Sequence, residues 1–471
     1  MNNIDVKKPE YSKETLSEAV FSDASRTRAW IEVSLDALRH NVEYLQSLLP
    51  SHCALMPVVK ANAYGHGAGL IARELNALGI RSFCVACVSE GVELRHQNIS
   101  GEILVLGYTH PDQFPLLDQY ALTQTVVDHA HALALSAYAC SASRHRLLSA
   151  KKPGQIFPSH ANSRNSLPLC PDTGKGESPL PVHIAVDTGM HRLGEPAEHT
   201  AQIQEMLTLP GLQVTGMYSH LAAASGTDFA SRNFTQEQID TFFRLAAQLH
   251  NRSNESVASC TSQEDSEAVS SWEKPQLQAA PATGLPAAGS LLTHMRLHLQ
   301  ASYGILRYPL PDVDCARPGI ALYGLLSNAA DTRSFADKLR PVLSLRARVA
   351  SIHRLSPGES AGYDMAYTAT RPTAIATITI GYADGLPRSL SKGRGTVLLH
   401  GQLAPIIGRI CMDQLLVDVT AIPQTRPGHV ATLIGRDGQA SISAADLADA
   451  CGTITNELLS SLGPRLERLA L

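Results

Sequence analysis

A lysine at the end of an apolar run is the residue of this sequence best placed to do chemistry. The run from Cys53 to Val59 is typical of a buried strand, Lys60 follows it, and a glycine-rich turn leads into a helical pattern from Ala68 to Leu78. In parallel α/β folds, the carboxyl ends of the strands carry the active site. A partly desolvated lysine there can lose its proton and act as an imine-forming nucleophile or a base. Taken alone, the same pattern also fits a solvated strand end.

The composition is that of an ordinary globular protein long enough for two domains. The 471 residues are 44% hydrophobic and 17% charged, with a formal net charge of −4. No basic stripe indicates a nucleic-acid surface, and no apolar run approaches the roughly 18 residues that span a bilayer. The polar stretch 1–28 has no apolar signal core, and the nine cysteines follow no disulfide pattern. We therefore expect a cytoplasmic protein with neither nucleic acid nor membrane as a partner.

Two patterns resemble metal sites but lack essential members. Cys84 and Cys87 form a C-x-x-C without a second pair, so we interpret them as buried packing thiols. His294 and His298 are four residues apart, but Met295 stands where a hydrolase motif has glutamate, so we interpret both histidines as structural. No metal site is expected.

Up to about residue 328, short apolar runs alternate with amphipathic helical stretches. This repetition predicts parallel strands with helical crossovers, and their number favours a closed (β/α)8 TIM barrel over an open sheet. The expected strands are 30–33, 53–59, 82–88, 103–106, 122–126, 182–186 and 214–219, and the expected helices are 35–48, 68–78, 90–95, 129–141 and 236–249.

Later in the chain, short β-branched runs separated by Gly and Pro predict an antiparallel β domain. Its expected strands are 342–352, 373–380, 395–399, 404–407, 415–419 and 429–434, with a closing helix at 443–451.

The expected division is a flexible N-terminal tail at 1–27, the barrel at 28–328 and the β domain at 329–471. Two segments, about 143–180 and 251–288, are rich in Ser and Pro and cannot bury a useful apolar face. We interpret both as surface insertions into the barrel.

Several strings across both expected domains carry further reactive residues. They include VVKANAYGHG at 58–67, DTGMHRLG at 187–194, YSH at 218–220, RPGIALYG at 317–324, GYADG at 381–385 and GRICMDQ at 408–414. In this order they resemble the alanine racemase family of fold-type III pyridoxal-phosphate enzymes. In detail they are most similar to its serine/alanine racemase branch, without that branch's membrane domain.

The resemblance implies pyridoxal 5′-phosphate bound to Lys60, where it acidifies the substrate Cα–H. Racemisation then needs proton carriers on opposite faces, and the family pattern assigns them to Lys60 and Tyr363. A free tyrosine has a pKa near 10, so it needs positive charge nearby, which the pattern assigns to His220 and Arg317. Arg317 would face the pyridine nitrogen. Since arginine keeps its proton, the ring is a weaker electron sink than with a carboxylate partner, which discourages transamination.

The resemblance also implies how the cofactor is held. Tyr64, Ser302 and the backbone N–H groups of Gly319 and Ile320 would bind the phosphate. Arg192 would contact the cofactor's phenolate oxygen or the substrate carboxylate.

Residues of the expected β domain would complete the site. The backbone N–H of Met412 would bind the substrate carboxylate, and Tyr382 would lie beside the substrate. In the family, Tyr363 and Met412 reach the barrel of the other subunit, which implies a head-to-tail homodimer with shared active sites.

Two positions depart from the family pattern. Ala185 stands where the family has a lysine, often carbamylated, so Arg192 lacks its usual anion. Our hypothesis is that chloride or a nearby carboxylate replaces it. Asn456 replaces a tyrosine that contacts the phosphate and walls the substrate methyl group. Similar proteins with asparagine here are serine/alanine racemases, which predicts serine as a second substrate.

We therefore expect an amino-acid racemase that interconverts L- and D-alanine, accepts serine and supplies D-amino acids for peptidoglycan. The alternatives are a serine-preferring racemase and a decarboxylase of the same two-domain plan, against which Arg317 counts. Two further alternatives are a non-enzymatic carrier of pyridoxal phosphate and a degenerate racemase that serves as a binding protein.

Overall fold

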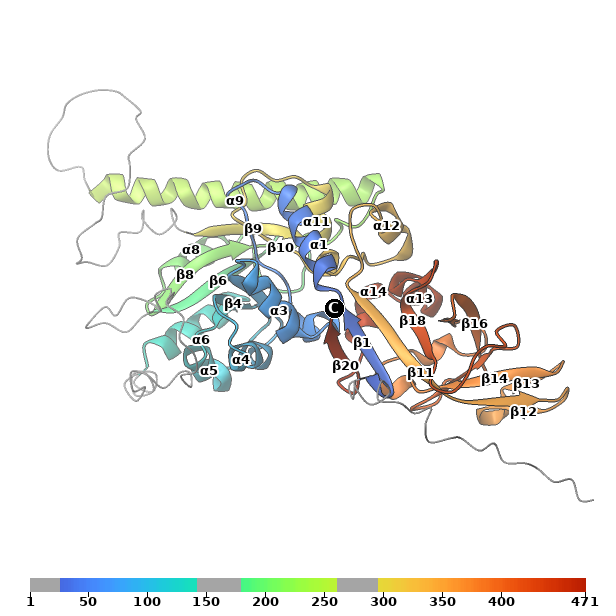
Figure 1. Ribbon diagram of the computed structural model, residues 1–471. Helices are drawn as coiled ribbons and strands as arrows, with labels where there is room; N and C mark the ends of the chain where they lie inside the picture. Colours follow the sequence, from blue (N-terminus) through green and yellow to red (C-terminus); the bar gives the residue numbers. More distant parts are fainter. Residues whose placement is uncertain (1–25, 142–178, 261–294) are drawn as a thin grey trace, which may run out of the picture. The chain divides into compact units, whose positions relative to one another are not determined.

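The computed structural model describes residues 26–141, 179–260 and 295–471 (Figure 1). Almost all of the expected tail at 1–27 and most of both expected insertions, 143–180 and 251–288, lie outside the described residues. The described chain forms two compact units. One is Arg39–Tyr323, and the other is Gly324–Leu471 together with the segment that ends at Leu38.

The first unit is a barrel of eight parallel strands. Its strands are β2 (Ala54–Leu55), β3 (Ser82–Val85), β4 (Glu102–Val105), β5 (Thr123–Val126), β6 (Leu180–Asp187), β8 (Leu212–Tyr218), β9 (Arg296–Ala301) and β10 (Cys315–Arg317). They run in the order β2-β10-β9-β8-β6-β5-β4-β3. A parallel bridge between Val58 and Cys84 joins the two ends of this path, and the N–H of Val59 donates to the carbonyl of Cys84 at 2.9 Å. The predicted TIM-like barrel is confirmed.

Helices follow the strands as the alternating pattern predicts. They are α3 (Ala68–Ala77), α4 (Val88–His96), α5 (Phe114–Gln119), α6 (His129–Ala139), α8 (Thr200–Thr208), α9 (Phe229–Cys260) and α11 (Ser302–Arg307). Strand residues such as Phe83, Ile103 and Ile184 are fully buried, so the apolar runs form the core. The long helix α9 continues through Cys260, beyond the expected end at 249 and into the expected insertion (Figure 1). Extending a nucleated helix costs little, even through residues with no apolar stripe.

Two local predictions about the barrel were wrong. Strand β2 covers only Ala54–Leu55 of the expected strand 53–59, with a single bridge at Val58 further on. Cys84 is buried as expected, but Cys87 is exposed because β3 has ended by Val85 and Cys87 precedes α4.

The second unit is a mainly antiparallel sheet in the order β19-β18-β15-β16-β17-β14-β11-β1-β20. Its strands are β1 (Ala29–Val33), β11 (Leu343–Leu355), β14 (Thr373–Ile378), β15 (Thr396–Leu399), β16 (Gln402–Ile407), β17 (Leu415–Asp418), β18 (Val430–Asp437), β19 (Ala440–Ile442) and β20 (Glu467–Ala470). The predicted antiparallel domain is confirmed, as is a helix near 443–451, α13 (Ala444–Cys451). A second helix, α14 (Thr455–Ser460), was not predicted.

Strand β1 belongs to this second sheet, although the sequence placed it at the start of the barrel. It pairs antiparallel with β11, with Ile31 opposite Leu345, and parallel with the C-terminal strand β20. An apolar pentapeptide fits either sheet equally well, and its partners lie about 300 residues away. The chain crosses between the units within α1 (Leu35–Ser47).

Within the described ranges, none of the helices combines the length and the apolar character needed to cross a bilayer.

Candidate active site

The barrel residues singled out by the sequence all follow the carboxyl ends of strands. Lys60 comes after β2, Arg192 after β6, His220 after β8 and Ser302 directly after β9, while Arg317 is the last residue of β10. In a parallel barrel these strand ends share one face, which is where barrel enzymes carry their active sites. The closed strand order therefore brings the predicted barrel residues to the same end of the first unit.

Lys60 opens a left-handed turn rather than the ordinary polar turn expected. Ala61, Asn62, Ala63 and Tyr64, the rest of the short element α2 (Lys60–Tyr64), have φ angles between 51° and 54°. The left-handed conformation costs a non-glycine residue roughly 1–2 kcal/mol. Four such residues in succession must be held by their surroundings, which indicates that the orientation of this segment matters.

Glu90 of α4 is one of the groups that hold this turn. Its carboxylate accepts the backbone N–H of Ala61 at 2.7 Å and that of Ala86 at 2.7 Å. The side chain of Asn62 accepts the N–H of Ala68 at 2.8 Å, which ties the turn to the start of α3. Glu90 was not predicted from the sequence. The available signal was an acidic residue in the first turn of the helix that follows the next strand.

The electrostatic surroundings of Lys60 favour its neutral form. Loss of hydration on burial lowers the pKa of the Lys60 amine, and the positive charge of Arg192 lowers it further, while Glu90 opposes both. A lysine with a lowered pKa is a better nucleophile and base at neutral pH.

Tyr64, Ser302 and Gly319 form a cradle that suits an anion. The hydroxyl of Ser302 accepts the N–H of Gly319 at 3.0 Å and that of Ala321 at 3.1 Å. A Cβ on Gly319 would lie 2.7 Å from the Tyr64 hydroxyl oxygen and 3.8 Å from Ser302 Oγ, so only glycine leaves this space open. Burial raises the pKa of Tyr64 to about 12, which keeps its hydroxyl protonated as a donor. Ile320 follows and is buried. These residues fit a phosphate group.

Arg317 is buried without a carboxylate among its described hydrogen-bond partners. Its side chain is only 3% exposed, and Nη2 donates to the carbonyl of Ser219 at 2.7 Å. Nη1 lies 2.5 Å from Nδ1 of His298, and the guanidinium carbon lies 4.6 Å from the ring centroid of Tyr218. Burial lowers the pKa of Arg317 from its ordinary value. The positive charge is thus held by neutral groups.

A buried chain of hydrogen bonds leads away from Arg317. Nε2 of His298 lies 2.8 Å from Nδ1 of His183, and Nε2 of His183 lies 3.2 Å from a Glu102 oxygen, which Arg296 also contacts at 2.7 Å. An arginine only donates, so Nδ1 of His298 must accept. His298 Nε2–H then donates to His183, whose Nε2–H donates to Glu102. Both rings are neutral, because burial lowers the pKa of each histidine.

His298 is fully buried and hydrogen-bonded to Arg317 and His183, which fits its interpretation as a structural histidine. The contact of His298 with Arg317 could not be predicted from the sequence, because it depends on the pairing of β9 with β10. His294 lies outside the described residues.

His220 is also kept neutral. Burial lowers the pKa of His220 to about 3, with further contributions from the charges of Arg317, Arg192 and Lys60. Its backbone carbonyl accepts a hydrogen bond from Gln238 at 3.2 Å. Of the two residues expected to supply positive charge near a catalytic tyrosine, only Arg317 carries a charge at neutral pH.

In the second unit, Tyr363 and Tyr382 line one hollow of about 620 Å³ together with Asp364, Arg388 and Ile410. Tyr363 is 65% exposed and Tyr382 42% exposed. The position of Arg388 in this hollow was not predicted from the sequence. The available signal was a cation four residues after the aspartate of the GYADG string.

Two residues that depart from the family pattern have distinctive surroundings. Asn456, the second residue of α14, buries its Oδ1, which has no hydrogen-bond partner within the described residues. A buried acceptor without a partner costs about 1–3 kcal/mol, so a ligand contact there would be favourable. Ala185 is buried in β6 and places no charge there, whereas Arg192 is exposed.

Fold and site together define a barrel protein with a β domain, whose strand ends carry a deprotonatable amine, a buried cation and an anion cradle. A model of the alanine racemase N-terminal domain matches residues 33–280, and a model of the C-terminal domain matches residues 342–470. The chain belongs to the alanine racemase family, whose members are isomerases.

Curated relatives extend this similarity along almost the whole chain. An amino-acid racemase of Enterococcus faecalis is 35% identical over 94% of this chain and 52% of its own length. An alanine racemase of Nostoc sp. is 33% identical over 94% of this chain and 96% of its own. A serine/alanine racemase of Enterococcus gallinarum is 33% identical over 93% of this chain and 51% of its own. The chain thus spans about half the length of the two Enterococcus relatives.

Solved structures give the same result. An alanine racemase of Clostridium difficile 630 has a TM-score of 0.72 at 26% identity, covering 94% of this chain and 96% of that one. The alanine racemase of Bartonella henselae, solved with covalently bound pyridoxal phosphate, has a TM-score of 0.68 at 25% identity, covering 94% of this chain and 100% of that one.

Proposed function

We propose that this protein interconverts L- and D-alanine with pyridoxal 5′-phosphate as cofactor. The observation that carries the proposal is the pairing of two features at one end of the barrel. The Lys60 amine has a lowered pKa, and Tyr64, Ser302 and Gly319 form a cradle for a phosphate. A phosphate anchor and a reactive lysine are what a pyridoxal-phosphate enzyme needs from its barrel.

The residues of this chain divide the work. When bound, the cofactor draws electron density from the substrate and so acidifies its Cα–H. Lys60 carries the proton at Cα on one face, and Tyr363 carries it on the other. Arg192 holds the substrate carboxylate or the cofactor's phenolate oxygen. Met412, through its N–H, binds the substrate carboxylate.

Arg317 favours racemisation over the rival decarboxylation. It would donate a hydrogen bond to the pyridine nitrogen and keep its own proton, because its described partners are neutral acceptors and no carboxylate draws it away. A decarboxylase of the same plan would be expected to have an acidic partner there.

We infer that the active unit is a homodimer in which Tyr363 and Met412 serve the partner's barrel. The exposure of the Tyr363 and Met412 side chains, 65% and 52%, supports this role. The products would be D-amino acids for peptidoglycan.

We infer that serine is a second substrate. The buried Oδ1 of Asn456 has no partner among the described residues and could accept a hydrogen bond from a substrate hydroxyl. The Enterococcus gallinarum relative named serine/alanine racemase agrees with this inference. We also keep the hypothesis that chloride or another anion replaces the missing lysine partner of Arg192.

Chiral chromatography of L-alanine and L-serine incubated with the full chain and pyridoxal phosphate tests the function. Both D-enantiomers should form. The Lys60→Ala variant should lose racemisation and the visible absorbance of the lysine-bound cofactor, whereas Lys392→Ala, a surface lysine control, should keep both. Release of carbon dioxide would identify a decarboxylase, and absence of any turnover would indicate a binding protein.

A further inference from the structure

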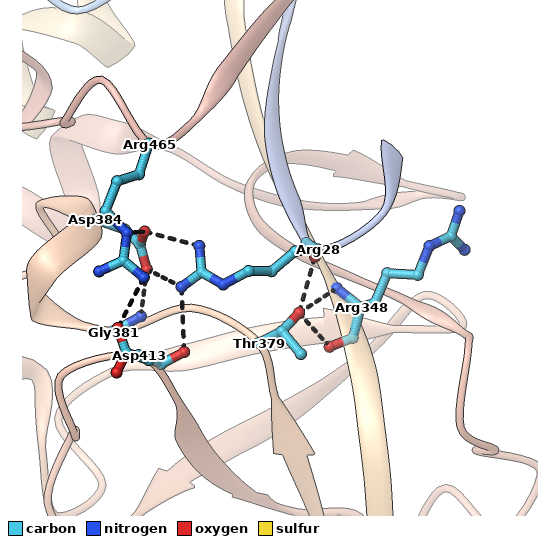
Figure 2. Close-up of polar contacts among 7 residues, drawn as sticks. All are labelled: Arg28, Arg348, Thr379, Gly381, Asp384, Asp413 and Arg465. Carbon is cyan, nitrogen blue, oxygen red and sulfur yellow. Dashed lines mark hydrogen bonds and ion pairs between the residues drawn. The ribbon is translucent and has the colours of Figure 1, made fainter. Parts of the chain in front are cut away.

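A fully buried carboxylate lies beneath the exposed residues of the second unit. Asp384 is 0% exposed and belongs to the GYADG string that carries Tyr382. Its two oxygens accept bidentate hydrogen bonds from Arg28, at 2.8 Å and 2.5 Å (Figure 2). Arg465 Nε lies 3.4 Å from the same carboxylate, and the N–H of Gly381 donates to it at 2.9 Å. One anion thus joins the N-terminal segment, the Tyr382 loop and the C-terminal segment.

The same two arginines also hold the loop that carries Met412. Arg28 donates to the carbonyl of Asp413 at 3.3 Å, and Arg465 donates to the Asp413 carboxylate at 2.7 Å (Figure 2). Neither arginine contacts the side chain of Met412 or Tyr382 in these bonds. They fix the backbone on which those side chains stand.

Direct backbone bonds connect the two loops to each other. The N–H of Tyr382 donates to the carbonyl of Cys411 at 3.1 Å, and the N–H of Ala383 donates to that of Met412 at 3.0 Å. A Cβ on Gly381 would lie 2.3 Å from the Cys411 oxygen, so glycine is required for this approach. Any shift of the Asp384 loop must therefore move the Met412 loop.

Arg28 is itself held at its backbone. Its carbonyl accepts the hydroxyl of Thr379 at 2.8 Å and the N–H of Arg348 at 2.8 Å (Figure 2). The hydrogen bond with Asp384 raises the pKa of Arg28, so the guanidinium keeps its charge. Removing either member of this ion pair leaves the other charge without its partner, which disfavours the arrangement that the pair holds.

We propose that Asp384, Arg28 and Arg465 are positioning residues for substrate binding. This ion cluster, centred on the buried Asp384, sets the backbone of Met412 and the direction of Tyr382, and through them the affinity for the carboxylate of an amino-acid substrate. The inference rests on the proposed function, because that function assigns the substrate to Met412 and Tyr382.

The test compares Asp384→Asn with a matched control. Asparagine keeps the shape but removes the charge that holds both arginines. The control is Glu32→Gln. Glu32 is a partly buried carboxylate in β1 of the same unit, and its partners among the described residues are Arg346 at 2.9 Å and the indole N–H of Trp30 at 3.0 Å. Arg28→Lys, which keeps the charge but loses the bidentate geometry, serves if Asp384→Asn fails to fold.

For Asp384→Asn we expect KM for L-alanine to rise by about tenfold or more, with a smaller change in kcat, since misplaced binding groups weaken substrate contacts. Hydrogen exchange of the amides in 381–385 and 411–414 should accelerate in the same variant. Glu32→Gln should change neither quantity, even where it lowers the melting temperature. Arg28→Lys should show the same pattern at reduced size.

Unchanged KM and unchanged exchange in a folded Asp384→Asn protein would overturn the inference. Equal rises of KM in Asp384→Asn and Glu32→Gln would overturn it too, because they would indicate general loss of stability. A wild-type protein without racemase activity would refute the proposed function instead, while the exchange measurement would still decide whether the ion cluster fixes the two loops.

Discussion

The two units of this molecule place two arginines, the partly exposed Arg28 and the buried Arg317, in opposite surroundings. In the second unit, Arg28 binds Asp384 directly, and this bond raises its pKa. In the barrel, Arg317 has only neutral partners among the described residues, and burial lowers its pKa. The nearest carboxylate along its hydrogen-bond chain, Glu102, is reached only through two histidines.

This difference separates an arginine that is paired with a carboxylate from one that only neutral groups hold among the described residues. A bidentate carboxylate uses the donors and the charge of its arginine. Neutral acceptors orient a guanidinium without cancelling its charge, although a buried charge without a counter-ion lowers stability. Among the described residues, the barrel thus holds Arg317 without a carboxylate partner, whereas the second unit pairs Arg28 with the carboxylate of Asp384.

The largest effect should come from replacing Arg317, because this exchanges the buried cation of the barrel for a carboxylate. In Arg317→Glu, a carboxyl group replaces the guanidinium beside His298. The same group would face the pyridine nitrogen of the cofactor. Racemase activity should fall by about 10²–10³-fold, as for the loss of a preorganised donor, and transamination of alanine to pyruvate should become detectable. The control is Arg296→Gln, because Arg296 contacts Glu102 at the opposite end of the hydrogen-bond chain that begins at Arg317. An equal loss of activity in both variants would contradict a special role for Arg317.

A second prediction concerns how much Glu102, at the end of the hydrogen-bond chain in the barrel, contributes to the stability of the protein. The pKa of Glu102 is lowered to about 2: burial would raise it, but the hydrogen bond from His183 and the charge of Arg296 outweigh burial. A carboxylate with a lowered pKa in the folded state stabilises the protein above its unfolded pKa. That stability, about 3 kcal/mol for this shift, should be lost between about pH 4.5 and pH 2. Urea unfolding across this range measures it, and Glu102→Gln should flatten that part of the pH profile. A variant with the wild-type slope would refute the assignment.

The sequence predicted the parts of this molecule that local patterns encode. Lys60 at a strand end, the barrel and the antiparallel domain follow from apolar periodicity and turn residues, which act over a few neighbours. The left-handed turn from Ala61 to Tyr64 does not, since nothing in an alternating apolar pattern specifies a positive φ.

Contacts between distant parts of the chain could not be predicted either. Arg28 and Asp384 are 356 residues apart, and His183 and His298 are 115 apart. Their types alone favour surface positions or a metal site, and only the strand order brings them together. Asn456 could be singled out by resemblance, but its buried, unpartnered oxygen is a finding of the structure.

The buried Oδ1 of Asn456 bears on the choice between alanine and serine as substrate. Asn456→Tyr replaces a small amide by the residue that the family pattern has at this position. We expect turnover of serine to fall by about tenfold more than turnover of alanine, because a site that bonds a substrate hydroxyl distinguishes strongly between substrates. Competition between L-serine and L-alanine, followed by chiral chromatography, measures the ratio. Asn456→Gln, which keeps the amide, is the control, and equal losses for both substrates in Asn456→Tyr would contradict the pocket role.

The smallest effect should come from His220, which belongs with the neutral groups of the barrel. Because the pKa of His220 is lowered to about 3, the ring is uncharged throughout the physiological range. Its folded pKa is below that of an unfolded histidine, so it stabilises the protein above about pH 6.5, and this stability is lost as the pH falls. The variant His220→Asn should reduce kcat/KM by less than about tenfold, since it replaces one uncharged polar side chain by another and removes no charge. The pH profile of kcat/KM should keep its shape between pH 6 and 8. Disappearance of a titration step in that range would show that His220 is protonated in the working enzyme. The barrel would then hold a positive charge on His220 as well as on Arg317.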